Sequence, residues 1–186
     1  MTRMARTILI TGGGRSGKSI YAQRIAESIP GDRAYIATCP VVDKEMEERI
    51  RKHREARRAG NWQTIEETTD LAAALTRTMG SQVILIDCLT LWVNNLMYQS
   101  ELQKKEMGEE EIVERCRNIL GVCDAISGTV IFVTNEIGMG IVPDNALSRR
   151  YLDLAGRCNQ VMAGHADAVI FMVSGLPLRI KGEIVI

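Results

Sequence analysis

Residues 8–19 read Ile8-Leu9-Ile10-Thr11-Gly12-Gly13-Gly14-Arg15-Ser16-Gly17-Lys18-Ser19, an apolar β-type run that stops at three glycines before a Gly-Lys-Ser triplet. From Gly12 onward the match to G-x-x-x-x-G-K-[ST] is complete, in the strand–loop–helix setting that this motif requires. Backbone N–H groups in such a loop turn toward a phosphate chain, and the helix N-terminus adds its positive dipole end. We therefore predict that Lys18 reaches the β- and γ-phosphates of a nucleotide and that the Ser19 hydroxyl binds Mg²⁺.

The glycines allow two other interpretations. Gly12, Gly14 and Gly17 also satisfy the dinucleotide fingerprint, which expects an acidic residue at the end of the next strand. The next predicted strand, residues 33–37, runs into Thr38-Cys39-Pro40 and offers no carboxylate. A glycine-rich turn that precedes Lys-Ser by chance would lack the flanking strand and helix. The motif therefore favours phosphate binding.

The composition is that of a globular protein with one domain. The 186 residues are 46% hydrophobic, and 23 Lys and Arg balance 23 Asp and Glu, so no net charge attracts nucleic acid. We see no apolar run near the roughly 18 residues of a membrane span and no signal peptide after the basic residues at the start. Five scattered cysteines without CxxC spacing indicate reduced thiols, and hence a cytoplasmic protein.

Predicted strands and helices alternate along the chain as in βαβ units. After the strand that ends at the glycines, strands are expected at 33–37, 61–65, 83–87, 129–134 and 168–173, with a short run at 178–181. Helices are expected at 17–28, 43–58, 69–79, 89–98, 109–126 and 144–165. This order predicts an α/β fold, a three-layer α/β/α P-loop NTPase-like sandwich with a mostly parallel sheet, in which residues 1–186 form a single nucleotide-binding domain.

Ligands of such sheets bind outside the carboxyl ends of the strands. Asp87 ends an apolar strand as the Walker-B acid does, which predicts a role in holding Mg²⁺; its alternative role is to cap the helix at 89–98. Asn135 and Glu136 end another strand, and Gly138 and Gly140 follow them. In one interpretation, Glu136 contacts a metal or nucleophile, and the glycines allow the loop to close over the substrate. In the other, the two residues form a polar connection from the strand to the loop, and Glu136 caps backbone groups there.

Six cations and one anion lie within residues 49–58, and His53 is among them. The gradient from acidic to basic residues along this helix also suits a surface helix that complements its macrodipole. Neighbouring cations lower the pKa of an imidazole, and a neutral imidazole is a nucleophile toward phosphorus. From the residues alone, a catalytic and a structural His53 are equally supported. His165 continues the apolar stripe of the long helix and is interpreted as structural.

Several blocks together resemble one known family. The most specific is Thr134-Asn135-Glu136-Ile137-Gly138-Met139-Gly140-Ile141-Val142-Pro143, and the others are residues 11–19, 35–38, 46–54, 87–90, 94–96, 153–160 and 173–177. The chain is similar, over nearly its whole length, to the bifunctional adenosylcobinamide kinase/adenosylcobinamide-phosphate guanylyltransferases of cobalamin biosynthesis. The resemblance implies two reactions. A nucleoside triphosphate phosphorylates adenosylcobinamide, and a histidine then carries GMP from GTP to that phosphate, giving adenosylcobinamide-GDP.

The resemblance also implies the site residues. The guanylylated histidine corresponds to His53, and metal binding falls on Ser19 and Asp87. The nucleotide contacts correspond to Gly12, Gly13, Gly14, Arg15, Ser16, Gly17, Lys18, Ser19, Ala37, Thr38, Cys39, Arg54, Glu55, Ala56, Arg57, Glu66 and Asp87. The implied ligands are ATP, GTP, Mg²⁺ and a corrinoid substrate, and the implied assembly is a homotrimer. Competing hypotheses are a P-loop kinase of another small alcohol and a non-catalytic nucleotide switch.

Overall fold

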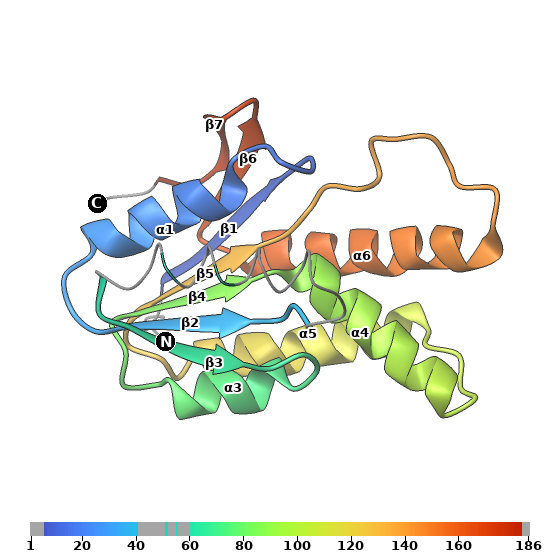
Figure 1. Cartoon of the computed structure of the whole chain (residues 1–186), viewed down its shortest axis with the longest axis horizontal. Helices are drawn as coiled ribbons and strands as arrows, with labels where there is room; N and C mark the ends of the chain where they lie inside the picture. Colours follow the sequence, from blue (N-terminus) through green and yellow to red (C-terminus); the bar gives the residue numbers. More distant parts are fainter. Residues whose placement is uncertain (1–5, 41–50, 52–54, 56–59, 184–186) are drawn as a thin grey trace.

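A computed structural model describes residues 6–40, 51, 55 and 60–183 of the chain. Its centre is a seven-stranded sheet with the strand order β3-β2-β4-β5-β1-β6-β7. All neighbouring strands are parallel except β6 and β7, which are antiparallel. The predicted α/β fold with a mostly parallel sheet is therefore confirmed (Figure 1).

The strands are β1 (Arg6–Gly12), β2 (Arg33–Ala37), β3 (Trp62–Glu66), β4 (Val83–Asp87), β5 (Thr129–Val133), β6 (Ala168–Val173) and β7 (Leu176–Lys181). The helices are α1 (Lys18–Ser28), α3 (Leu71–Arg77), α4 (Leu89–Leu102), α5 (Glu109–Cys123) and α6 (Ala146–His165).

Apolar residues cover both faces of the sheet, as the continuous apolar strands predict. On one face, Ile8 and Ile10 of β1 pack with Ala22 and Ile25 of α1. On the other, Leu9 lies in a larger core with side chains of α3, α4, α5 and α6. Helices thus lie on both sides of the sheet in Figure 1, and the three layers are those predicted.

The element bounds differ from the predicted ones mainly at helix ends. Helix α4 continues four residues past the predicted end at 98, and α5 stops at Cys123 instead of 126. Helix α6 starts at Ala146, because the Asn145 side chain accepts a hydrogen bond from the Ser148 N–H at 2.7 Å and caps it. Leu147, an apolar residue in the first turn of this helix, is 51% exposed.

The predicted helix at 43–58 lies outside the described residues except for two positions. Arg51 and Glu55 are both helical and exposed, and they form an i,i+4 ion pair of 2.8 Å. An exposed pair of this kind contributes only a few tenths of a kcal/mol.

Candidate functional site

Apart from Glu55, the predicted site residues that the structure describes lie at one edge of the sheet, at or directly after the carboxyl ends of its parallel strands. The P-loop follows β1, and Asn135 and Glu136 follow β5. In the registers of β2, β3 and β4, Ala37 pairs with both Glu66 and Asp87. Strand β5 lies between β1 and β4, so it separates the P-loop from Asp87 by one strand.

Gly12 allows the P-loop to begin against the neighbouring strand. Its φ is +144°, and a Cβ atom built on it would lie 2.4 Å from the Met172 carbonyl oxygen of β6. Any side chain would therefore force β1 and β6 apart. Gly17, with φ +91°, precedes α1. It has no side chain that could accept hydrogen bonds from the N–H groups in the first turn of α1. These N–H groups are the donors that a phosphate would accept.

Lys18 is the first residue of α1 and is nearly buried, at 6% exposure. Its Nζ donates hydrogen bonds to the Gly13 carbonyl oxygen at 2.5 Å and to Ser16 Oγ at 3.4 Å. The ammonium group therefore lies within the loop itself. The next residue, Ser19, is half-buried in the first turn of the same helix.

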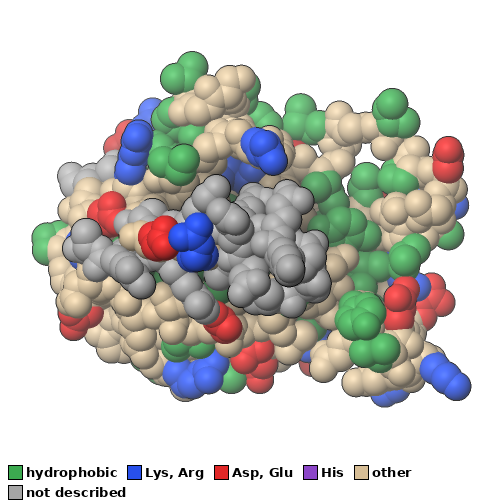
Figure 2. Space-filling view, in the orientation of Figure 1, with side chains coloured by type: hydrophobic (Ala, Val, Ile, Leu, Met, Phe, Trp, Pro, Cys, Tyr) green, Lys and Arg blue, Asp and Glu red, His purple; other side chains and the backbone are tan. Residues whose placement is uncertain are grey.

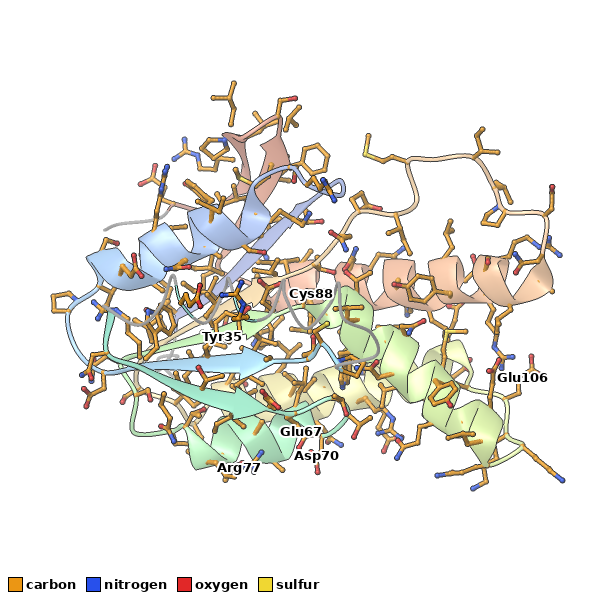
Figure 3. All side chains as sticks on the ribbon, in the orientation of Figure 1. Tyr35, Glu67, Asp70, Arg77, Cys88 and Glu106 are labelled. Carbon is orange, nitrogen blue, oxygen red and sulfur yellow. The ribbon has the colours of Figure 1, made fainter. Side chains whose placement is uncertain are left out.

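Asp87, at the end of β4, is half-buried and accepts a hydrogen bond from Tyr35. The Tyr35 hydroxyl lies 3.2 Å from Asp87 Oδ2 and reaches it from the adjacent strand β2; Tyr35 is labelled in Figure 3. The Tyr35 ring makes an edge contact with Trp62, with centroids 6.2 Å apart. Tyr35 was not predicted as a site residue, because nothing in residues 33–37 indicates which neighbouring strand supplies the hydrogen-bond partner of its hydroxyl.

Thr38 joins the ends of β2 and β4. It is fully buried, and its hydroxyl donates to the Cys88 carbonyl at 2.8 Å and accepts from the Cys88 N–H at 2.7 Å. Asn95 of α4 donates to the Thr38 carbonyl oxygen at 2.8 Å. The Thr38 side chain, which was predicted to contact the nucleotide, thus holds the carboxyl ends of β2 and β4 together. Cys88 is itself buried, and burial together with the charge of Asp87 raises the pKa of its thiol to about 11, which makes it a poor nucleophile at neutral pH.

A buried polar network supports the segment that follows β5. The hydroxyls of Thr90 and Thr134 lie 3.2 Å apart, and Thr134 donates to Asn159 Oδ1 at 2.7 Å. The Asn135 backbone completes the network, with its N–H 2.6 Å from Thr90 Oγ1 and its carbonyl oxygen 3.0 Å from Asn159 Nδ2. The Glu136 N–H then donates to the Gly12 carbonyl at 3.0 Å, which ties this segment to the P-loop.

Replacing Asn159 with leucine is expected to lower the free energy of unfolding by about 1–3 kcal/mol, because Thr134 and the Asn135 carbonyl would lose buried partners. Asn118→Leu, at an exposed position of α5, is a matched control that should change stability by less than about 0.5 kcal/mol. Urea denaturation of both variants measures the difference. Equal effects at the two positions would contradict the importance of the network.

Glu66 ends β3 and Glu67 follows it, but the two carboxylates differ in their surroundings. Glu66 is exposed at the strand end. Glu67 accepts hydrogen bonds from the N–H groups of Thr69 and Asp70, both at 3.0 Å, and lies 3.6 Å from Arg77. Partial burial opposes its ionisation, but the backbone donors and Arg77 prevail and hold the pKa of Glu67 below its usual range. Glu67 and Asp70 are labelled near the start of α3 in Figure 3, and Arg77 ends this helix; Glu67 thus stabilises the turn before α3.

The predicted residues His53, Arg54, Ala56 and Arg57 lie outside the described residues. His165 is the last residue of α6, at the opposite edge of the sheet, with Nε2 3.4 Å from Asp124 Oδ1. Within the described ranges, no group of three or more His, Cys, Asp or Glu side chains is arranged to hold a metal ion by itself. A magnesium ion bound by Ser19 and Asp87 would thus rely on nucleotide phosphates for further oxygen ligands.

Comparison with known proteins extends over nearly the whole chain. A bifunctional adenosylcobalamin biosynthesis protein, CobP from Pseudomonas aeruginosa, is 44% identical over 176 residues, covering 94% of this chain and 97% of its own. CobU proteins of the same description from Salmonella typhimurium and Escherichia coli are each 38% identical, covering 94% of this chain and 99% of theirs.

A KaiC-like protein from Pyrococcus horikoshii shares the fold, with a TM-score of 0.53 at 14% identity, over 89% of this chain and 70% of its own. None of the helices in the described part of the chain is long and apolar enough to cross a membrane. Residues 8–180 match the sequence model of the family described as cobinamide kinase/cobinamide phosphate guanyltransferase. With the P-loop and Asp87 at one edge of the sheet, this match shows that the chain belongs to that family of bifunctional enzymes.

Proposed function

We propose that this enzyme phosphorylates the aminopropanol hydroxyl of adenosylcobinamide with ATP or GTP and then transfers GMP from a second nucleotide, GTP, to the new phosphate. The product is adenosylcobinamide-GDP. The observation that carries the proposal is the match of residues 8–180 to a family named for both activities. The P-loop and the Asp87 carboxylate lie one strand apart at the same edge. This placement supports the proposal, because both steps require a phosphate-binding loop and a metal ligand close to each other.

His53 is proposed to carry the GMP. Its imidazole nitrogen attacks the α-phosphorus of GTP, an N–P bond forms, and the bond to pyrophosphate breaks. A phosphate oxygen of the cobinamide phosphate then attacks the same phosphorus, and the imidazole leaves. The cations within residues 49–58 favour a neutral, nucleophilic imidazole and oppose the charge of the triphosphate.

The nucleotide is proposed to bind along the edge, with its phosphates in the loop of residues 12–19. The Lys18 ammonium, which donates to the Gly13 carbonyl oxygen, lies within this loop. Ala37, Thr38, Cys39 and Glu66 follow or end the adjacent strands β2 and β3, and Arg54, Glu55, Ala56 and Arg57 lie beside His53 in the sequence. Ser19 and Asp87 offer the oxygen ligands that Mg²⁺ prefers, and the ion would neutralise phosphate charge as the transfer proceeds.

We further propose a homotrimer that works in the cytoplasm. The five cysteines are all free thiols, as expected in a reducing compartment. Large apolar side chains are exposed where α4, α6 and the loop before α6 project from the sheet, and hydrophobic atoms are visible there at the right of Figure 2. They are Tyr98, Leu102, Met139, Ile141, Val142 and Leu147. Light scattering during gel filtration would test the trimer, and a monomeric mass would contradict it.

GTP labelled at the α-phosphate tests the central step. The wild-type enzyme with Mg²⁺ should acquire a covalent label that is stable to base and lost in acid, as a phosphoramidate is. Adding phosphorylated cobinamide should move the label to the corrinoid. An unlabelled protein that still phosphorylates alcohols would instead indicate a P-loop kinase of another small alcohol.

A further inference from the structure

This inference rests on the proposed function. Of its steps, only the phosphorylation of the alcohol requires a base. The imidazole that attacks GTP is neutral, and the cobinamide phosphate that accepts GMP is already an anion. The alcohol that attacks the γ-phosphorus in the kinase step must lose a proton as it becomes an ester. A carboxylate beside the terminal phosphate is therefore expected to serve the kinase step alone.

The strand order selects the place where such a group would lie. Because β5 separates β1 from β4, residues that follow β5 lie between the phosphate loop and Asp87. Glu136 is the only Asp or Glu between the end of β5 and Asp144. Its N–H donates to the carbonyl oxygen of Gly12, the first glycine of the P-loop, at 3.0 Å.

Hydrogen bonds hold both the backbone before Glu136 and the Glu136 carboxylate itself. Before it, the N–H and carbonyl of Asn135 are bound by Thr90 at 2.6 Å and Asn159 at 3.0 Å, both within the buried network. After it, the Gly138 N–H donates to Glu136 Oε1 at 3.2 Å. Asp87, the other carboxylate at this part of the edge, is engaged by Tyr35 and is assigned to the metal.

We propose that Glu136 is the general base of the kinase step. As the alcohol oxygen bonds to the γ-phosphorus, the bond from that phosphorus to the β-phosphate oxygen breaks, and the nucleoside diphosphate leaves with the electron pair. The hydroxyl proton passes to the Glu136 carboxylate. The buried network, through Asn135, positions that carboxylate beside the phosphate loop.

The Glu136→Gln variant separates this role from turn formation. Glutamine keeps an oxygen that can accept the Gly138 N–H, so the turn remains possible, but it cannot take up the proton. The rate of phosphoryl transfer to adenosylcobinamide should fall about 10²–10⁴-fold, the usual contribution of a general base. The KM for the nucleotide should change by less than about twofold, because uniform binding is not altered.

Two further assays use the same preparation. Self-labelling by α-labelled GTP, and GMP transfer to chemically supplied cobinamide phosphate, should both remain at the wild-type rate. Asp144→Asn, an exposed acid eight positions later in the chain, is the matched control and should leave all three rates unchanged. Glu136→Asp should recover part of the kinase rate.

Three outcomes would overturn the assignment. Equal losses in all three assays would place Glu136 on the metal or the shared nucleotide, and unchanged rates would restrict it to the turn. A wild-type enzyme that labels itself but never phosphorylates adenosylcobinamide would defeat the proposed kinase function, and the assignment with it.

Discussion

The His53→Ala variant is expected to take up no GMP from α-labelled GTP, a loss of at least about 10³-fold, because the atom that bonds to phosphorus is removed. Phosphorylation of adenosylcobinamide should continue near the wild-type rate. That step depends on the P-loop, Asp87 and the residues after β5, none of which bonds covalently to the substrate. Labelled protein and labelled corrinoid, separated after acid and base treatment, measure the two halves independently.

His165→Ala is the matched control, since the chain has two histidines. His165 ends α6 at the opposite edge of the sheet, near Asp124, and its loss should leave labelling intact. Label that persists in His53→Ala but disappears in His165→Ala would reverse the assignment. Label that persists in both variants would require a nucleophile other than histidine.

Lys18→Ala is expected to lower kcat/KM of both the kinase and the guanylylation step by about 10²–10³-fold. The nearly buried ammonium is the cation at the centre of the phosphate loop, and a clamp of this kind stabilises charge that develops during transfer. Lys18→Arg should not restore the rates, because a guanidinium is larger and planar and cannot act as a compact point charge at this nearly buried position.

Lys105→Ala, on the exposed turn after α4, removes the same charge away from the edge and should leave both rates within about twofold, as a surface substitution does. Steady-state kinetics of each half-reaction, with circular dichroism to verify folding, provide the measurement. If Lys18→Ala abolished one activity and spared the other, the two nucleotides would have to bind at separate places.

The parts of the fold that local sequence determines were predictable. A run of apolar residues that ends at glycines or at a carboxylate specifies a buried strand and its end, which is why the predicted strands at 33–37, 83–87 and 168–173 coincide with β2, β4 and β6. Helix ends were less accurate. The apolar pattern stops near residue 98, whereas α4 continues to Leu102 through mostly exposed residues, where helix propensity is only a weak guide.

Contacts between distant residues were not predictable from one sequence. The Tyr35–Asp87 hydrogen bond joins residues 52 positions apart, and the Thr38–Cys88 pair spans 50. Each depends on which strands are neighbours, and the sequence contains no local signal for that order. The same holds for Glu136. Its position at a strand end was predicted, but its place between the P-loop and Asp87 follows only from the insertion of β5 in the sheet.

The position of β1 in the interior of the sheet has a consequence for biosynthesis. Its two partners, β5 and β6, come from the last third of the chain, and Thr7 is bonded to Asp167, 160 residues away. During translation the phosphate-binding loop is thus among the first segments made and among the last to be completed. Such long-range pairing is slow and leaves an apolar strand exposed in the nascent chain. Nucleotide affinity should therefore appear only after β6 has left the ribosome.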